Sequence, residues 1–140
     1  MVKKKLIVLF FAALLAACGS NKQNETQSSG PFADFDQADV ALLYFHGKQR
    51  CVTCLTVQEV AEQAMAERLA NNDAVQFMEI DFSLPENEAL AEKYEIVFSS
   101  LVVATPEQYT DITEQAFDMA LSRPEELKDL IEKEVKNLLN

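Results

Sequence analysis

The residues best suited to chemistry in this chain of 140 are two cysteines, Cys51 and Cys54, with Val52 and Thr53 between them. Two thiols at this spacing can form a disulfide, exchange it with another thiol, or share a metal ion. If the pair opens a helix, the free backbone amides and the helix dipole favour a thiolate at the first cysteine. The second cysteine then lies on the same side of the first turn. We therefore predict that Cys51 is the attacking sulfur and Cys54 the resolving one.

A structural disulfide and a metal site are the alternatives to redox exchange. A bridge between Cys51 and Cys54 closes a very short loop, so it constrains the unfolded chain little and is a poor structural staple. A zinc site would need further ligands, and His46 is the only histidine in the chain. Two cysteines and one histidine leave a closed zinc shell one ligand short. We therefore place redox exchange first and predict no bound metal and no other cofactor.

The segments on either side of the pair are predicted to be a strand and a helix. The run from Asp39 to Phe45, which includes Tyr44 as a core residue, is almost entirely apolar and typical of a buried central strand. After the pair, apolar residues recur every three or four positions along one face of a helix that ends near Asn71. These positions are Val57, Val60, Ala61, Ala64, Met65 and Leu69. The cysteines therefore fall at a strand-to-helix junction.

The rest of the chain alternates between strand and helix patterns. The expected elements are a strand over 75–82, a helix over 83–94, a strand over 101–104, a returning strand over 109–112, a short helix ending near 121 and a last helix after 122. Ser83 and Ser122 each stand three residues before a glutamate, a spacing that predicts side-chain caps at two helix starts. Strands that alternate with helices predict an α/β domain, in which helices pack on the faces of a sheet.

The segment from Phe45 to Cys54 resembles the active-site loop of the thioredoxin superfamily, which follows a buried strand and opens a long helix. Residues 77–81 are similar to the next strand of that family, and residues 87–95 to its following helix. The resemblance implies a thioredoxin-like three-layer sandwich, with a central mixed sheet and helices on both faces. It also implies that Cys51 and Cys54 are the catalytic residues of a thiol–disulfide oxidoreductase, which needs no bound cofactor but does need a redox partner.

Three features depart from the pattern of that family. Arg50 stands where an aromatic residue usually precedes the first cysteine, and the dipeptide between the cysteines is Val52-Thr53. The cis-proline that faces the pair in the family is replaced by Ser99 and Ser100, which are the candidate substrate-binding residues. A cis bond before a residue other than proline costs about 2.5–4 kcal/mol, so we expect the bond before Ser100 to be trans. The missing proline leaves open a second function, a thioredoxin-fold binding module for a metal ion or a partner protein.

The first 30 residues have the pattern of an export signal followed by a tether. Three lysines precede an apolar run from Leu6 to Ala17, which is too short to span a bilayer. The segment from Leu15 to Gly19 resembles the lipobox of bacterial lipoproteins, in which cleavage of the signal leaves a lipidated cysteine. We therefore predict a signal peptide over 1–17, lipidation of Cys18, a flexible tether over 18–30 and one folded domain over 31–140.

The predicted domain is strongly acidic, because 22 Asp and Glu outnumber eight Lys and Arg within residues 31–140. Few cations are available to displace counterions from phosphates, which argues against binding to nucleic acid. The same charge opposes docking of the folded surface on anionic lipid, so the lipid at Cys18 is the predicted link to the membrane. We expect a domain of the cell envelope that faces outside the cytoplasm. Its expected partners are the thiols or disulfides of exported proteins, and a redox partner that resets the pair.

Overall fold

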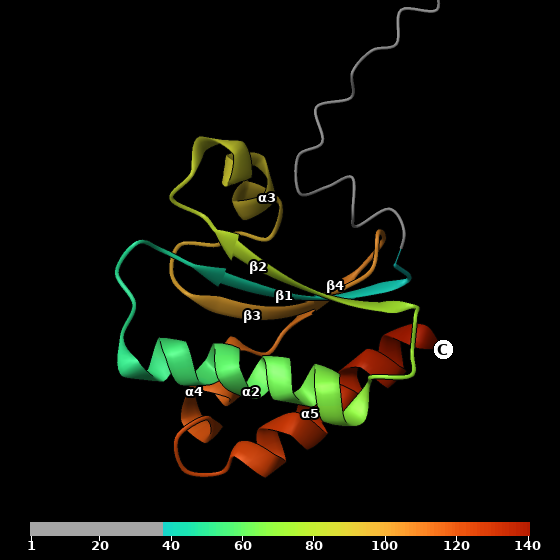
Figure 1. Ribbon diagram of the computed structural model, residues 1–140. Helices are drawn as coiled ribbons and strands as arrows, with labels where there is room; N and C mark the ends of the chain where they lie inside the picture. Colours follow the sequence, from blue (N-terminus) through green and yellow to red (C-terminus); the bar gives the residue numbers. More distant parts are fainter. Residues whose placement is uncertain (1–37) are drawn as a thin grey trace, which may run out of the picture.

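Four strands make one mixed sheet in the computed structural model, which describes residues 38–140 (Figure 1). In sequence order they are β1 (Val40–His46), β2 (Val75–Asp81), β3 (Ser100–Ala104) and β4 (Tyr109–Asp111). Their order across the sheet is β2-β1-β3-β4. β1 runs parallel to β2 and antiparallel to β3, and β4 runs antiparallel to β3. The predicted signal peptide, lipidation site and tether, together with residues 31–37 of the predicted domain, lie outside the described residues.

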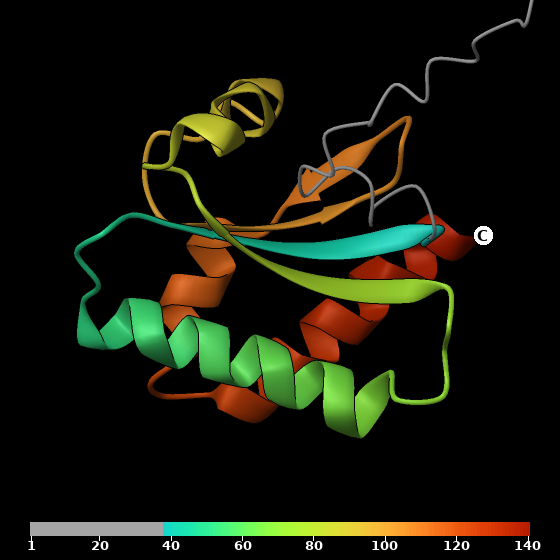
Figure 2. The same ribbon diagram turned by 45° about the horizontal axis from the view of Figure 1, so that its top comes forward.

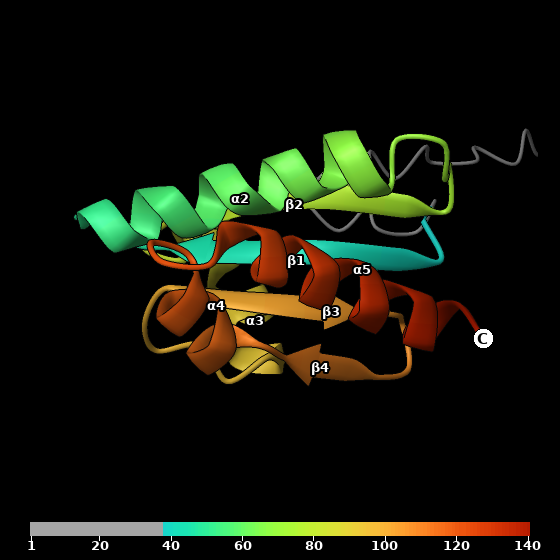
Figure 3. The same ribbon diagram turned by 90° about the horizontal axis from the view of Figure 1, so that it is seen from below.

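Helices cover both faces of this sheet. On one face lie α2 (Val52–Arg68), α4 (Thr113–Met119) and α5 (Pro124–Leu139), which are seen in front of the strands in Figure 3. On the other face lie the 3-10 turn η1 (Pro85–Asn87) and α3 (Glu88–Lys93). The predicted α/β sandwich of three layers is therefore confirmed, and so is the order of its elements. No helix within residues 38–140 is long and apolar enough to cross a membrane.

β1 is a central strand that contributes to both halves of the core. Leu42 and Tyr44 pack on the side of α2 and α5, whereas Leu43 and Phe45 pack on the side of α3. All four side chains are buried. Because both faces of the strand are covered, apolar residues are required at successive positions instead of alternate ones. This requirement explains the continuous apolar run by which the strand was predicted.

The sheet topology brings three connections to one end of the strands, the end where the cysteines lie (Figure 2). β1 ends at His46 and α2 begins at Val52, so the cysteine pair lies beyond the carboxyl end of β1. β3 runs antiparallel to β1 with Ser100 opposite Phe45, which places the loop before β3 at the same edge. β4 reverses direction once more, so its junction with α4 also returns there. The cysteine loop, the loop before β3 and the start of α4 are therefore neighbours.

The serine caps predicted at two helix starts are wrong, because each serine lies one residue before the N-cap position, which is occupied by Leu84 in η1 and by Arg123 in α5. The Ser83 hydroxyl donates to the carboxylate of Asp81 at 2.6 Å, and the Ser122 hydroxyl donates to the carbonyl of Asp118 at 3.3 Å. Neither η1 nor α5 has a side-chain cap. Each element begins instead with a proline, whose missing amide leaves one donor fewer to satisfy.

Candidate active site

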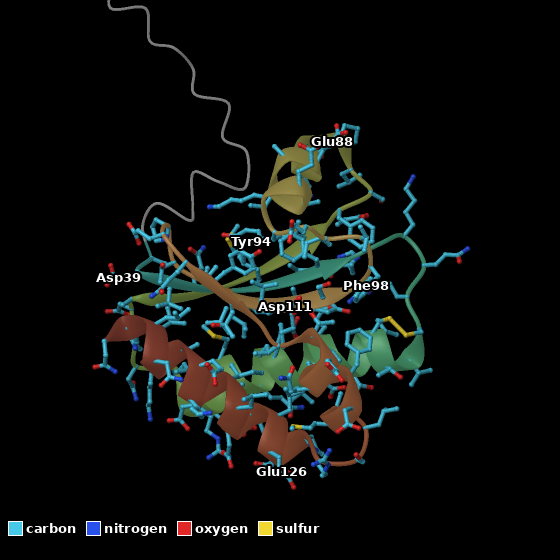
Figure 4. The ribbon with its side chains drawn as sticks, turned by 180° about the vertical axis from the view of Figure 1, so that it is seen from behind. Asp39, Glu88, Tyr94, Phe98, Asp111 and Glu126 are labelled. Atoms are coloured by element: carbon cyan, nitrogen blue, oxygen red, sulfur yellow. A yellow bond between two sulfur atoms is a disulfide. The ribbon has the colours of Figure 1, made fainter. Side chains whose placement is uncertain are left out.

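Cys51 and Cys54 form a disulfide at the start of α2, with their Cα atoms 5.0 Å apart. Figure 4 shows the bond in yellow at the first turn of the helix. The side chain of Cys51 is exposed, whereas Cys54 is only 8% exposed. An external thiolate or disulfide can therefore approach Cys51 from solvent, while Cys54 is covered by protein. This asymmetry is the one that an attacking and a resolving sulfur require.

The backbone around Cys51 is arranged to favour a negative charge on its sulfur. Cys51 is the N-cap residue of α2, and its Sγ accepts a hydrogen bond of 3.1 Å from the amide of Cys54. The helix extends for 17 residues, and its first turn contains no acidic side chain. No carboxylate of that turn therefore offsets the positive end of the helix dipole. When the disulfide is reduced, the free amides and this dipole favour the thiolate at Cys51.

Tyr44 forms a buried hydrogen bond to the backbone of the resolving cysteine. Its buried hydroxyl donates a hydrogen bond of 2.6 Å to the carbonyl oxygen of Cys54. Burial raises the pKa of Tyr44, and the positive charge of Arg50 opposes part of that rise. The phenol therefore stays protonated at neutral pH and remains a donor. Sequence reasoning treated Tyr44 as core only. The available signal was the tyrosine hydroxyl within a continuous apolar run, because a buried tyrosine hydroxyl usually has a hydrogen-bond partner.

Arg50 braces the cysteine loop against its surroundings. Its guanidinium donates to Glu79 on β2 at 2.9 Å and to Gln58 on α2. The same group lies over the ring of Tyr44, 5.5 Å from the centroid. Nε2 of His46 lies 3.0 Å from the Glu79 oxygen that Arg50 contacts. The residue that replaces the usual aromatic of the family therefore connects β1, β2 and α2 immediately before the disulfide.

Tyr44→Phe is expected to lower the free energy of unfolding by about 1 kcal/mol, because the ring remains and only one buried hydrogen bond is lost. Tyr94→Phe is the matched control. Tyr94 is also buried, but its hydroxyl has no hydrogen-bond partner within residues 38–140. Removal of that hydroxyl should leave the stability unchanged or raise it. Urea denaturation measures both variants, and equal losses would contradict the role assigned to the Tyr44 hydroxyl.

Ser99 and Ser100 lie at the same end of the strands as the cysteines, but only one of their side chains is free to contact a substrate. No peptide bond within residues 38–140 is cis, so the bond before Ser100 is trans as predicted. Ser100 is buried, and its hydroxyl donates to the carbonyl of Phe98 at 2.9 Å. Ser99 is half-buried and lines a cavity of about 560 Å³. Of the two serines, Ser99 is the one whose side chain borders open space.

Both ring nitrogens of His46 contact nearby oxygen atoms. Nδ1 lies 3.0 Å from the carbonyl oxygen of Gly47, and Nε2 lies 3.0 Å from the carboxylate of Glu79. In the part of the chain that the structure describes, no group of three or more His, Cys, Asp or Glu side chains is placed to hold a metal ion.

Comparisons with known proteins identify the architecture. No protein-family model matches the chain, and no curated protein sequence matches it significantly. Among solved structures, Trxlp from Edwardsiella tarda EIB202 superposes with a TM-score of 0.53 at 15% identity, over 74% of this chain and 92% of Trxlp. Oxidised thioredoxin from Plasmodium falciparum superposes with a TM-score of 0.51 at 17% identity, over 72% of this chain and 86% of the thioredoxin. The chain has a thioredoxin-like fold.

The zinc-bound form of human ERp44 is a third similar structure, with a TM-score of 0.56 and 19% identity. The match covers 76% of this chain but only 30% of ERp44. At these identities the superpositions establish the thioredoxin-like fold alone. The chemistry of the thioredoxin-like domain depends on its own residues, above all on the exposed sulfur of Cys51.

Proposed function

We propose that this protein is a thiol–disulfide oxidoreductase that acts on exported proteins. The observation that carries the proposal is the asymmetric pair, with an exposed Cys51 at the N-cap of a long helix and a covered Cys54 bonded to it. A purely structural bridge explains these features poorly, because a disulfide across two residues constrains the unfolded chain less than one that closes a long loop. The thioredoxin-like fold supports the proposal, since it positions the pair beyond the carboxyl end of the central strand β1, where Cys51 is exposed.

The proposed reaction in the reducing direction starts from the dithiol. The Cys51 thiolate attacks one sulfur of a substrate disulfide, a mixed disulfide forms, and the other substrate sulfur leaves as a thiolate. Cys54 then loses its proton to solvent and attacks Cys51, which restores the disulfide of the pair and releases the second substrate thiolate. Two electrons pass from the pair to the substrate, and a dithiol reductant returns them. The reverse sequence oxidises a substrate dithiol, and the reduction potential of the pair decides the direction.

We further propose that the substrate chain lies along the loop before β3. The hydroxyl of Ser100 is already used within that loop. Contacts to the substrate are therefore assigned to the side chain of Ser99 and to the backbone of both serines. Because no proline ring occupies this position, the approach to the sulfurs is shaped by these two small residues.

The proposed location is the cell envelope, where a lipid at Cys18 holds the domain to a membrane. The apolar run, the lipobox-like segment over 15–19 and the polar stretch that follows support this proposal. The mature chain is expected to begin at Cys18 and to carry acyl groups, each buried CH₂ contributing about 0.8 kcal/mol to membrane binding.

Mass spectrometry of the N-terminal peptide measures this lipidation, with Cys18→Ala as the variant and Cys51→Ala as the control. Cys18→Ala should abolish the acyl mass, whereas Cys51→Ala should retain it. A mature wild-type chain without acyl groups would contradict the anchor and would leave the redox proposal standing.

The activity is tested by the reduction of a protein disulfide with dithiothreitol as the electron source. The full chain should accelerate the reduction above the rate of dithiothreitol alone, and Cys51→Ser should not. The second hypothesis, a binding module, is motivated by the trans bond at Ser100 in place of the cis-proline. Metal analysis of the reduced chain distinguishes the two. Stoichiometric metal that is lost in Cys51→Ser, together with no disulfide exchange by the wild type, would favour the binding module.

A further inference from the structure

A cavity of about 560 Å³ opens at the same end of the domain as the disulfide, between the loop before β3 and the start of α4. Phe98 and Ser99 border it on one side, and Asp111, Glu114 and Phe117 on the other. Figure 4 shows the labelled Phe98 at the same end of the domain as the disulfide. Phe98 is 60% exposed, although it is a large apolar side chain at the rim of a cavity. The ring of Phe98 is therefore available for contact with a ligand that enters the cavity.

The cavity is connected to the disulfide through a short chain of contacts. Ser99 is close enough to Tyr44 to lower the pKa of its phenol, and the Tyr44 hydroxyl donates to the carbonyl of Cys54. On the opposite wall, the amide of Leu101 donates to the Thr113 hydroxyl at 3.0 Å, which ties the start of α4 to the start of β3. A substrate residue close to the reacting cysteine would therefore meet this cavity.

The charges around the cavity are of one sign. Its described lining residues include the carboxylates of Asp111 and Glu114 and no lysine or arginine. The Asp111 carboxylate accepts from the amide of Thr113 at 2.8 Å, a contact that leaves its charge in place. Neither carboxylate forms an ion pair within residues 38–140. Arg50 in the cysteine loop is already paired with Glu79.

We infer that this cavity binds a lysine or arginine side chain of the substrate, next to the cysteine that reacts with Cys51. The inference rests on the proposed oxidoreductase activity and names the class of substrate that the site selects. Lysine and arginine combine an apolar stem with a cationic head. The stem packs against the rings of Phe98 and Phe117, and the head lies near two carboxylates and an aromatic face, which both attract a cation. The general acidity of the domain adds a longer-range attraction for basic segments.

The test compares three peptides that are identical except for the two residues flanking a single cysteine, which are Lys, Gln or Glu. Each cysteine carries thionitrobenzoate in a mixed disulfide, and the reduced full chain, with Cys18→Ser in every version, displaces it. Release of thionitrobenzoate gives the second-order rate constant. At low salt the Lys peptide should react at least about 5-fold faster than the Glu peptide. The difference should shrink in 1 M salt, where the Debye length is about 3 Å.

Two variants locate the effect. Glu114→Gln and Phe98→Ala should each reduce the advantage of the Lys peptide by about 2–5-fold, the range of an exposed ion pair or cation–π contact. Glu107→Gln is the matched control, because it removes the same charge from the β3–β4 turn at the opposite end of the sheet. That variant should leave the ratio of the peptide rates unchanged.

Two results would overturn the inference while leaving the oxidoreductase proposal intact. One is an equal rate constant for the three peptides, and the other is an equal loss of preference in Glu107→Gln and Glu114→Gln. The activity itself is checked with hydroxyethyl disulfide, a small uncharged substrate. Failure to reduce hydroxyethyl disulfide and all three peptides would overturn the proposed function, and the inference with it.

Discussion

Cys54→Ala is expected to convert the protein into a trap for its own substrates. Without the second sulfur, the mixed disulfide formed by Cys51 has no internal nucleophile to resolve it, so it accumulates. Multiple turnover should fall to the rate of the reductant alone. Capture of exported proteins, seen on non-reducing gels and released by dithiothreitol, measures the effect. Because Cys54 is covered and Cys51 is exposed, the captured partner should be attached to Cys51.

Cys51→Ala is the matched control for this experiment. It also leaves one cysteine of the pair, but the remaining sulfur is the covered one, so it should capture little or nothing. Both variants should remain folded, because the disulfide closes only a very short loop. Comparable capture by the two variants would contradict the assigned roles. Absence of capture by Cys54→Ala, with no exchange by the wild type, would remove the basis of the proposed activity.

Leu42→Ala is expected to be the most damaging substitution for stability among those considered. Leu42 lies in the central strand β1, is 0% exposed and packs in the core beneath α2 and α5. Loss of a buried leucine side chain costs about 2–5 kcal/mol, because the cavity left behind closes only in part. Urea denaturation should therefore show a much lower midpoint with little change in slope. The same strand leads directly into the cysteine loop, so the variant should also lose redox activity near its unfolding transition.

Leu121→Ala provides the control, since it deletes the same atoms from a surface position. Leu121 is 60% exposed after the end of α4. Its replacement should change the free energy of unfolding by no more than about 0.5 kcal/mol. If Leu42→Ala were as mild as Leu121→Ala, β1 would not be the core strand that the structure describes.

The fold could be predicted because its central elements have simple patterns. β1 is apolar at successive positions since both of its faces are covered, and β2 and β3 occupy the expected segments. The start of α2 could not be predicted from the apolar periodicity, which begins only at Val57. Its first turn is largely exposed, as Val52 illustrates at 73%, and therefore carries no apolar pattern. The two helix starts predicted from serine spacing are present, but the serine caps are not, because Leu84 and Arg123 occupy the N-cap positions.

The candidate site could be predicted only in part. The spacing of Cys51 and Cys54 was enough to predict the pair and its position at a strand-to-helix junction. The supports of the site depend on the parallel register of β1 and β2, which sets Tyr44 opposite Glu79. That register allows Arg50 to contact both Glu79 and the ring of Tyr44. Arg50 and Glu79 are 29 residues apart in sequence. No local pattern encodes such a pairing, so these contacts were not foreseen.

The cavity at the same end of the domain as the disulfide is a second feature that local patterns do not show. Phe98 and Glu114 meet there because β3 and β4 reverse direction twice and return to the edge where β1 ends. In sequence, the acidic residues of this region look like part of a uniformly acidic surface. Only their placement around the exposed ring of Phe98 distinguishes them from the other carboxylates of the domain.

Once reduced, Cys51 is expected to carry a stabilised thiolate that solvent can reach. The most direct measurement is the rate of alkylation of Cys51 by iodoacetamide as a function of pH, in the full chain with Cys18→Ser and Cys54→Ala. We predict rapid alkylation with an apparent pKa clearly below the value of about 8.5 for a free cysteine thiol. An apparent pKa at or above that value, or a folded protein in which Cys51 does not react, would contradict the stabilised thiolate at Cys51.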